Sequence, residues 1–340
     1  TDDVTITGVA TLTPANAGPD QTVCATAATL AGNTPTAGTG TWTLVSGAGS
    51  ITAPGSPTSG VTALGVGANV FRWTISNGVC PNSTDDVVIT RDEEPTTSNA
   101  GPDQTVCAAT ATLAGNTPTV GTGTWTLVSG SGTITTPGSP ASGLTGLGVG
   151  ANSFRWTISN GACTASTDDV VITREEEPTT SNAGPDQSLC ATSATLAGNT
   201  PTVGTGAWTL VRGTGTITTA GSPTSGVTAL GVGPNVFRWT ITNGTCPSST
   251  DDVTITRDAA PTTSNAGPDQ TVCSTSATLA GNPPVSGTGA WTLVGGTGTI
   301  TTPGDPASGV TGLGLGANTF RWTISNGVCT ASTDDVVITR

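Results

Sequence analysis

The stretch FRWTISNGVC at residues 71–80 decides the fold, because it returns almost unchanged three times. The later copies read FRWTISNGAC at 154–163, FRWTITNGTC at 237–246 and FRWTISNGVC at 320–329. Each copy lies 83 residues after the one before it. Within the first copy, Phe71, Trp73 and Ile75 alternate with polar residues, as in a β-strand with one buried face. The chain is therefore predicted to be an array of similar small domains.

The repeat divides the 340 residues into four predicted modules, at 14–91, 96–174, 179–257 and 262–340. The first eight residues, TDDVTITG, match TDDVVITR at 84–91, which ends the first copy. We therefore expect residues 1–8 to form the last strand of a preceding module. On this interpretation the chain is a segment of a longer array.

Each module contains seven short apolar runs separated by turn signals such as GN, SG, PG and NG. In the first module the predicted strands are 20–23, 27–32, 40–47, 49–52, 59–64, 69–76 and 85–90. Period-2 alternation places Leu30, Trp42 and Leu44 on the inward face, together with Phe71, Trp73 and Ile75.

Seven strands in about 80 residues, with no apolar period of helical length, predict an immunoglobulin-like β-sandwich. The predicted fold class is all-β, a tandem array of seven-stranded immunoglobulin-like sandwiches. We expect the tryptophans in the core rather than on a surface binding platform, which is the alternative. The tryptophans are Trp42, Trp73, Trp125, Trp156, Trp208, Trp239, Trp291 and Trp322.

Charge and composition exclude several functions. The net charge is −13, every cation is Arg, and the chain has no His. A chain this acidic does not suit nucleic-acid phosphates or an anionic membrane surface. The absence of His removes the commonest general base, and no window is apolar enough to span a bilayer. We expect no enzyme activity, no cofactor, no nucleic-acid partner and no membrane insertion.

Three motifs carry a resemblance to a known family: SNAGPDQTV at 98–106, ATLAGN at 111–116 and STDDVVIT at 83–90. They resemble the polycystic-kidney-disease-like (PKD-like) and related immunoglobulin-like repeats of bacterial surface proteins. The cysteine-bearing form is most similar to repeats of very large secreted adhesins of the Bacteroidetes. This resemblance implies a secreted protein at a bacterial cell surface. Members of the family serve as spacers, adhesin stalks and accessory modules of secreted hydrolases.

Acidic residues near the predicted joints are candidate calcium ligands, because carboxylate oxygens suit this hard cation. The candidates are Asp85, Asp86, Glu93, Glu94 and Asp103. Alternatively, these acids pair with Arg72 or keep a sheet edge soluble. The linker RDEEPTTS at 91–98 becomes RDAAPTTS at 257–264, which loses two acids. A required calcium site would not lose its ligands at one joint, so we expect no metal.

Eight cysteines, two in each module, predict disulfides in an oxidising compartment. Cys24 follows the first strand of its module and Cys80 the sixth, so they lie at opposite ends. A strand of about seven residues separates those ends by roughly 23 Å, whereas bridged Cα atoms lie within about 7 Å. Pairing within a module, Cys24 with Cys80, would require a miscounted strand.

The favoured pairing therefore joins successive modules. The predicted bonds are Cys24 with Cys163, Cys107 with Cys246, and Cys190 with Cys329. Cys80 and Cys273 are expected to pair outside the segment.

The predicted function is a structural segment of an extracellular rod or fibre, stiffened by disulfides. An odd number of strands places the entry and exit of each module at opposite ends, so tandem copies extend. The expected partners are neighbouring modules of the same chain and other copies in a filament. The alternatives are adhesive modules that bind glycan or host protein, and accessory modules of a secreted enzyme.

Overall fold

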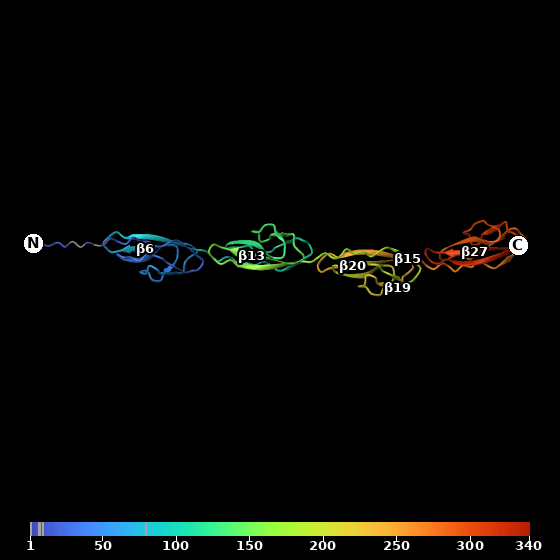
Figure 1. Cartoon of the computed structure of the whole chain (residues 1–340), viewed down its shortest axis with the longest axis horizontal. Helices are drawn as coiled ribbons and strands as arrows, with labels where there is room; N and C mark the ends of the chain where they lie inside the picture. The colour runs from blue at the N-terminus through green and yellow to red at the C-terminus, as the bar shows by residue number, and fades with distance from the viewer. Residues whose placement is uncertain (1, 6–7, 9, 79) are drawn as a thin grey trace. The chain divides into compact units, whose positions relative to one another are not determined.

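The computed structural model describes residues 2–5, 8, 10–78 and 80–340, and every regular element in them is a β-strand (Figure 1). The first module contains β1 Gln21–Val23, β2 Ala28–Thr29, β3 Thr39–Ser46, β4 Ser50–Ile51, β5 Gly60–Thr62, β6 Gly67–Ser76 and β7 Ser83–Arg91. The second contains β8 Gln104–Val106, β9 Ala111–Thr112, β10 Thr122–Ser129, β11 Thr133–Ile134, β12 Gly143–Thr145, β13 Gly150–Ser159 and β14 Ser166–Arg174.

The remaining modules repeat this order. The third contains β15 Gln187–Leu189, β16 Ala194–Thr195, β17 Thr205–Arg212, β18 Thr216–Ile217, β19 Gly226–Thr228, β20 Gly233–Thr242 and β21 Ser249–Arg257. The fourth contains β22 Gln270–Thr271, β23 Ala277–Thr278, β24 Thr288–Gly295, β25 Thr299–Ile300, β26 Gly309–Thr311, β27 Ala317–Ser325 and β28 Ser332–Thr339. The all-β fold class predicted from the sequence is confirmed.

Each module consists of two sheets that enclose one core. In the first module the sheet β1-β7-β6-β3 has four strands and the sheet β2-β5-β4 has three. Strand β1 pairs with β7 in parallel, and the other pairs are antiparallel. The first and last strands of the module therefore run in the same direction, from the end where the chain enters, called the near end here, to the far end.

The core of the first module is built around the cross-strand pair Trp42 and Trp73, whose ring centroids lie 4.9 Å apart. Both side chains are buried, as are Phe71 and Ile75 on the same face of β6. The indole N–H of Trp42 donates to the carbonyl of Pro57, and that of Trp73 to the carbonyl of Asn33, each at 3.2 Å. The same arrangement recurs in the other modules, so all eight tryptophans are core residues.

A buried polar residue completes each core. The Asn69 side chain is 1% exposed, and its amide nitrogen donates to the carbonyls of Gly65, Gly67 and Ile89. Its Oδ1 accepts a hydrogen bond from the backbone of Ala48. Every polar atom of this amide is therefore paired, which removes the cost of burying it. Asn69 thus fixes the loop before β6 against the last strand.

One expectation from the sequence was wrong. Leu44 was placed on the inward face, but it is 41% exposed. Leu44 pairs in register with the buried Phe71, so it shares the inward face, but β3 is the edge strand of its sheet and its pairing breaks just after Leu44, so this side chain is only partly covered. Residues 1–8 were expected to be the last strand of a preceding module; the described residues 2–5 and 8 have no assigned strand, and the expectation stays a prediction. Residues 1, 6 and 7 lie outside the described residues.

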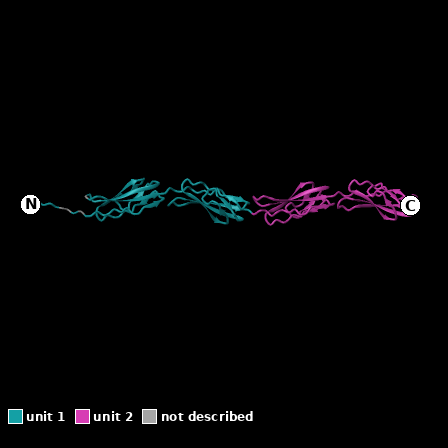
Figure 2. Ribbon diagram, turned by 90° about the horizontal axis from the view of Figure 1, so that it is seen from above, with its two compact units in different colours: residues 1–175 teal, residues 176–340 magenta. Residues whose placement is uncertain are grey.

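The chain divides into two compact units, Thr1–Glu175 and Glu176–Arg340, shown in teal and magenta in Figure 2. Each unit contains two of the sandwiches, and each is described by itself below. Among the described residues, none forms a helix that could cross a membrane.

Candidate functional site

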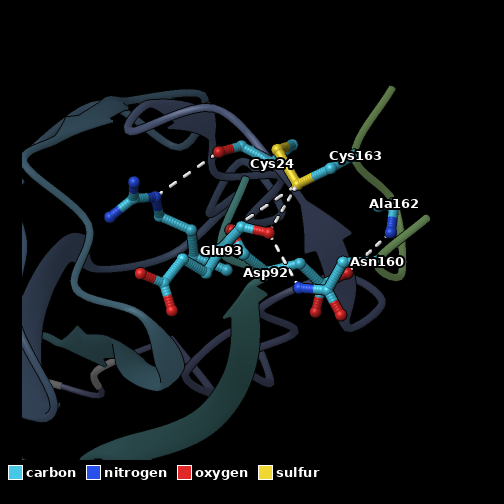
Figure 3. Close-up of a disulfide and its surroundings, with 7 residues drawn as sticks. Cys24, Asp92, Glu93, Asn160, Ala162 and Cys163 are labelled. Carbon is cyan, nitrogen blue, oxygen red and sulfur yellow. Dashed lines mark hydrogen bonds between the residues drawn. A yellow bond between two sulfur atoms is a disulfide. The ribbon is translucent and has the colours of Figure 1, made fainter. Parts of the chain in front are cut away.

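The joint between the two sandwiches of a unit is the most elaborate site in the described chain. In the first unit it comprises Cys24, which directly follows β1, linker residues 92–95, and the turn 160–163 before β14 (Figure 3). Cys24 is bonded to Cys163, with their Cα atoms 4.8 Å apart. This is the pairing that strand parity favoured. It joins the far end of one sandwich to the near end of the next.

The linker is also held by hydrogen bonds at this joint. The backbone N–H of Asp92 donates to the carbonyl of Val23 at 2.9 Å, which continues the parallel pairing beyond β1. Its carboxylate accepts a hydrogen bond of 2.6 Å from the backbone N–H of Ala162. The Asn160 side chain donates to the carbonyl of Glu93 at 2.7 Å. Asp92 is thus bound to the turn of the next sandwich through its side chain, and Glu93 is bound to it through its backbone carbonyl.

The turn that receives Asp92 requires glycine. Gly161 has a φ of 50°, in the left-handed region, and a Cβ there would overlap the Asp92 carboxylate. Asn-Gly is a common turn pair because both residues tolerate this region. At this joint the glycine also makes room for the incoming carboxylate.

The same joint is built in the second unit. Cys190 is bonded to Cys329 with their Cα atoms 5.0 Å apart. The Asp258 carboxylate accepts a hydrogen bond of 2.9 Å from the N–H of Val328, and Asn326 donates to the carbonyl of Ala259 at 2.7 Å. Alanine at position 259 serves as well as Glu93 because only its backbone takes part. This contact explains how the linkers differ in sequence and still make the same joint.

An arginine holds the far end of each sandwich. The Arg91 guanidinium donates to the carbonyl of Leu64 at 3.0 Å and to the carbonyl of Cys24 at 3.4 Å. Arg174 makes the equivalent bonds to Leu147 and Cys107. In the first joint, the cysteine that enters the disulfide is therefore supported from its own module.

The candidate calcium ligands do not converge on one point. The Asp85 carboxylate accepts a hydrogen bond from the backbone of Ala17 at 2.7 Å, and that of Asp103 from the backbone of Val171 at 2.8 Å. Glu93 and Glu94 are exposed. The Asp85 and Asp103 contacts thus bind the segment that enters a module to the last strand of the same module.

Asp86 pairs instead with Arg72 across the β6–β7 hairpin, in the arrangement weighed as the alternative to a metal. Arg72 Nε and Nη2 donate to the two carboxylate oxygens at 2.8 and 2.9 Å. These hydrogen bonds lower the pKa of Asp86 and raise the pKa of Arg72. Desolvation opposes both shifts. The pair recurs as Arg155–Asp169, Arg238–Asp252 and Arg321–Asp335.

One group of potential metal ligands does occur at the joint. The sulfur atoms of Cys24 and Cys163 and the Glu94 carboxylate lie within 4.8 Å of one another. Since the two sulfurs are bonded to each other, neither is the thiolate that a metal ion would need. The group is therefore a disulfide with a neighbouring acid.

The remaining cysteines are Cys80, Cys107, Cys246 and Cys273. Cys80 and Cys273 hold free thiols in the part of the chain that the structure describes. The predicted bond between Cys107 and Cys246 involves one residue of each unit, and it stays a prediction.

The cysteines of the joint were predicted from the sequence. Asp92, Asn160 and Gly161, which hold the linker against the turn, were not predicted. The shared first acid of the linkers at 92, 175 and 258 was the available signal, together with the Asn-Gly pair before each second cysteine.

No protein-family model and no curated protein matches the chain. Among solved structures, it is similar to titin domains I67–I69, with 13% identity, a TM-score of 0.44, and coverage of 73% of this chain and 98% of that one. The insect immune protein hemolin gives 12% identity and a TM-score of 0.30 over 96% of this chain and 98% of that one. The N-terminal four Ig domains of Dscam1 give 13% identity and 0.30, covering 97% and 98%. The strand order and register described above define this chain as tandem immunoglobulin-like sandwiches joined by disulfides.

Proposed function

We propose that the chain is a structural segment of an extracellular rod or stalk, which holds another part of its protein at a distance from a surface. The observation that carries this proposal is the joint. A flexible tether would need no more than a linker. Here the linker is bound on both sides and a disulfide spans the same point.

The disulfides also indicate in which compartment the protein is found. Disulfides persist in oxidising environments outside the cytosol, so they fit an extracellular protein. The resemblance of the repeats to those of bacterial surface adhesins favours a filament or adhesin stalk at a bacterial cell surface. We propose further that the segment is not an enzyme, and that its partners are neighbouring modules and other copies in a filament.

Small-angle X-ray scattering of the oxidised full chain tests this proposal. We expect a maximum dimension several times the cross-section. The double variant Cys24→Ser/Cys163→Ser should give a broader distribution of dimensions, because one joint has lost its covalent bond. The matched control Cys80→Ser/Cys273→Ser, which removes only free thiols, should scatter like the wild type. A compact globular profile for the oxidised wild type would contradict a spacing function.

A further inference from the structure

The disulfides Cys24–Cys163 and Cys190–Cys329 connect strands that run in the same direction. Strand β1 ends one residue before Cys24, and β14 begins three residues after Cys163. β1 is the first strand of its sandwich and β14 the last, and each pairs in parallel with its counterpart. Both strands therefore lead from the near end to the far end of their modules. The covalent path through β1, the disulfide and β14 always runs forward.

This path is much shorter than the backbone. Cys24 and Cys163 are 139 positions apart in sequence, but one bond connects them. The bypassed loop contains the four tryptophans of the first unit, at positions 42, 73, 125 and 156, and the antiparallel strand pairs β3–β6 and β10–β13 that carry them. Cys190 and Cys329, also 139 positions apart, enclose the four tryptophans of the second unit in the same way.

A chain under tension becomes taut along its shortest covalent path. We infer that the disulfides, and not the sandwich cores, carry tension along this chain, and that they shield the enclosed modules from forced unfolding. Even if β1 and β14 detach from their sheets, the residues between the bonded cysteines form a closed loop and cannot be drawn out. This inference does not depend on the proposed function, since it concerns only how a force applied to the two ends is transmitted.

The disulfides limit how far the chain can lengthen under tension. In the oxidised chain, the longest backbone stretch between the two bonds runs from Cys163 to Cys190, which are 27 positions apart. At ~3.5 Å per residue this stretch spans at most about 95 Å. Full reduction, which also opens any bond between Cys107 and Cys246, frees the 139 positions that each disulfide bypasses, or roughly 450–500 Å of additional contour length for each.

Single-molecule force spectroscopy on the full chain, held at its two ends, measures these lengths directly. Oxidised chains should show no single release longer than about 100 Å. After reduction with a phosphine, the total contour length should increase by roughly 900–1,000 Å, because both bypassed loops become accessible. The releases should then resemble the unfolding of whole modules.

Variants separate this load path from a general effect of the reductant. The double variant Cys24→Ser/Cys163→Ser should lengthen by at least roughly 350 Å without reductant, even with a bond between Cys107 and Cys246 in place. The matched control Cys80→Ser/Cys273→Ser should behave like the oxidised wild type. The inference is overturned by releases of module length in oxidised wild-type chains, by long releases in the control, or by a contour length that reduction leaves unchanged. Failure here would leave the scattering result, and so the spacing function, unaffected.

Discussion

Gly40 and Trp73 show how closely single residues fit within each sandwich. Gly40 lies in β3 opposite Ile75, and a Cβ at Gly40 would overlap the indole ring of Trp73. The equivalent glycines Gly123, Gly206 and Gly289 face the equivalent tryptophans in the same way. A glycine normally weakens a strand, but here it provides the space that the largest core side chain occupies.

Replacing Trp73 with Ala should destabilise its module by roughly 3–5 kcal/mol, because it removes a fully buried side chain and leaves a cavity. Denaturant unfolding followed by circular dichroism measures the loss. The same substitution of the exposed Val45 is the control and should have little effect. A Trp73→Ala chain that unfolds like the wild type would refute the role of this side chain in the core.

The Arg72–Asp86 pair predicts a pH dependence. Arg72 lowers the pKa of Asp86 in the folded state, so the pair stabilises the fold above the unfolded pKa of about 3.9, and that contribution is lost as the pH falls through the folded value. Asp86→Asn should therefore melt below the wild type at pH 7, with the difference shrinking at an acid pH well below the unfolded value of about 3.9. Thermal melts at both pH values test this, and an equal difference at both would contradict it.

At the scale of elements, the joint depends on one side chain of the linker and on the backbone of the next residue. Asp92→Ala removes the acceptor for the N–H of Ala162 and should speed amide hydrogen exchange at Ala162. Glu93→Ala is the matched control, because Asn160 contacts only its carbonyl oxygen and the other unit already has Ala259 there. Faster exchange in the Glu93→Ala chain, or none in Asp92→Ala, would show that the linker is held differently.

The sequence predicted those elements whose evidence is local. Strand β6 was identified because Phe71, Trp73 and Ile75 alternate strictly, and the cysteine pairing followed from counting strands. Leu44 was expected to be buried because the apolar pattern does not show that its strand lies at the edge of the sheet, where an inward side chain stays partly exposed. The contact of Asp92 with Ala162 joins residues 70 positions apart, and no local pattern reports a contact at that separation.

At the scale of the whole molecule, calcium should be dispensable. The Asp85, Asp86 and Asp103 carboxylates are already bonded within their own modules, and the linker at 257–264 has lost two acids. Adding EDTA should leave the melting temperature of the oxidised chain unchanged. A large decrease that added calcium reverses would show that the acids form a metal site.

The span of each disulfide also constrains how the protein is made. The partner of Cys24 lies 139 positions later in the chain. At about 5–20 residues per second, roughly 7–30 s of synthesis pass before that partner is made. Cys80 and Cys107 emerge first and are available as wrong partners. Once the first sandwich has folded, Cys24 and Cys80 lie at its opposite ends and cannot meet. Folding that precedes oxidation would therefore select the correct bond, and a secretion pathway that oxidised the nascent chain too early would trap it in a mispaired form.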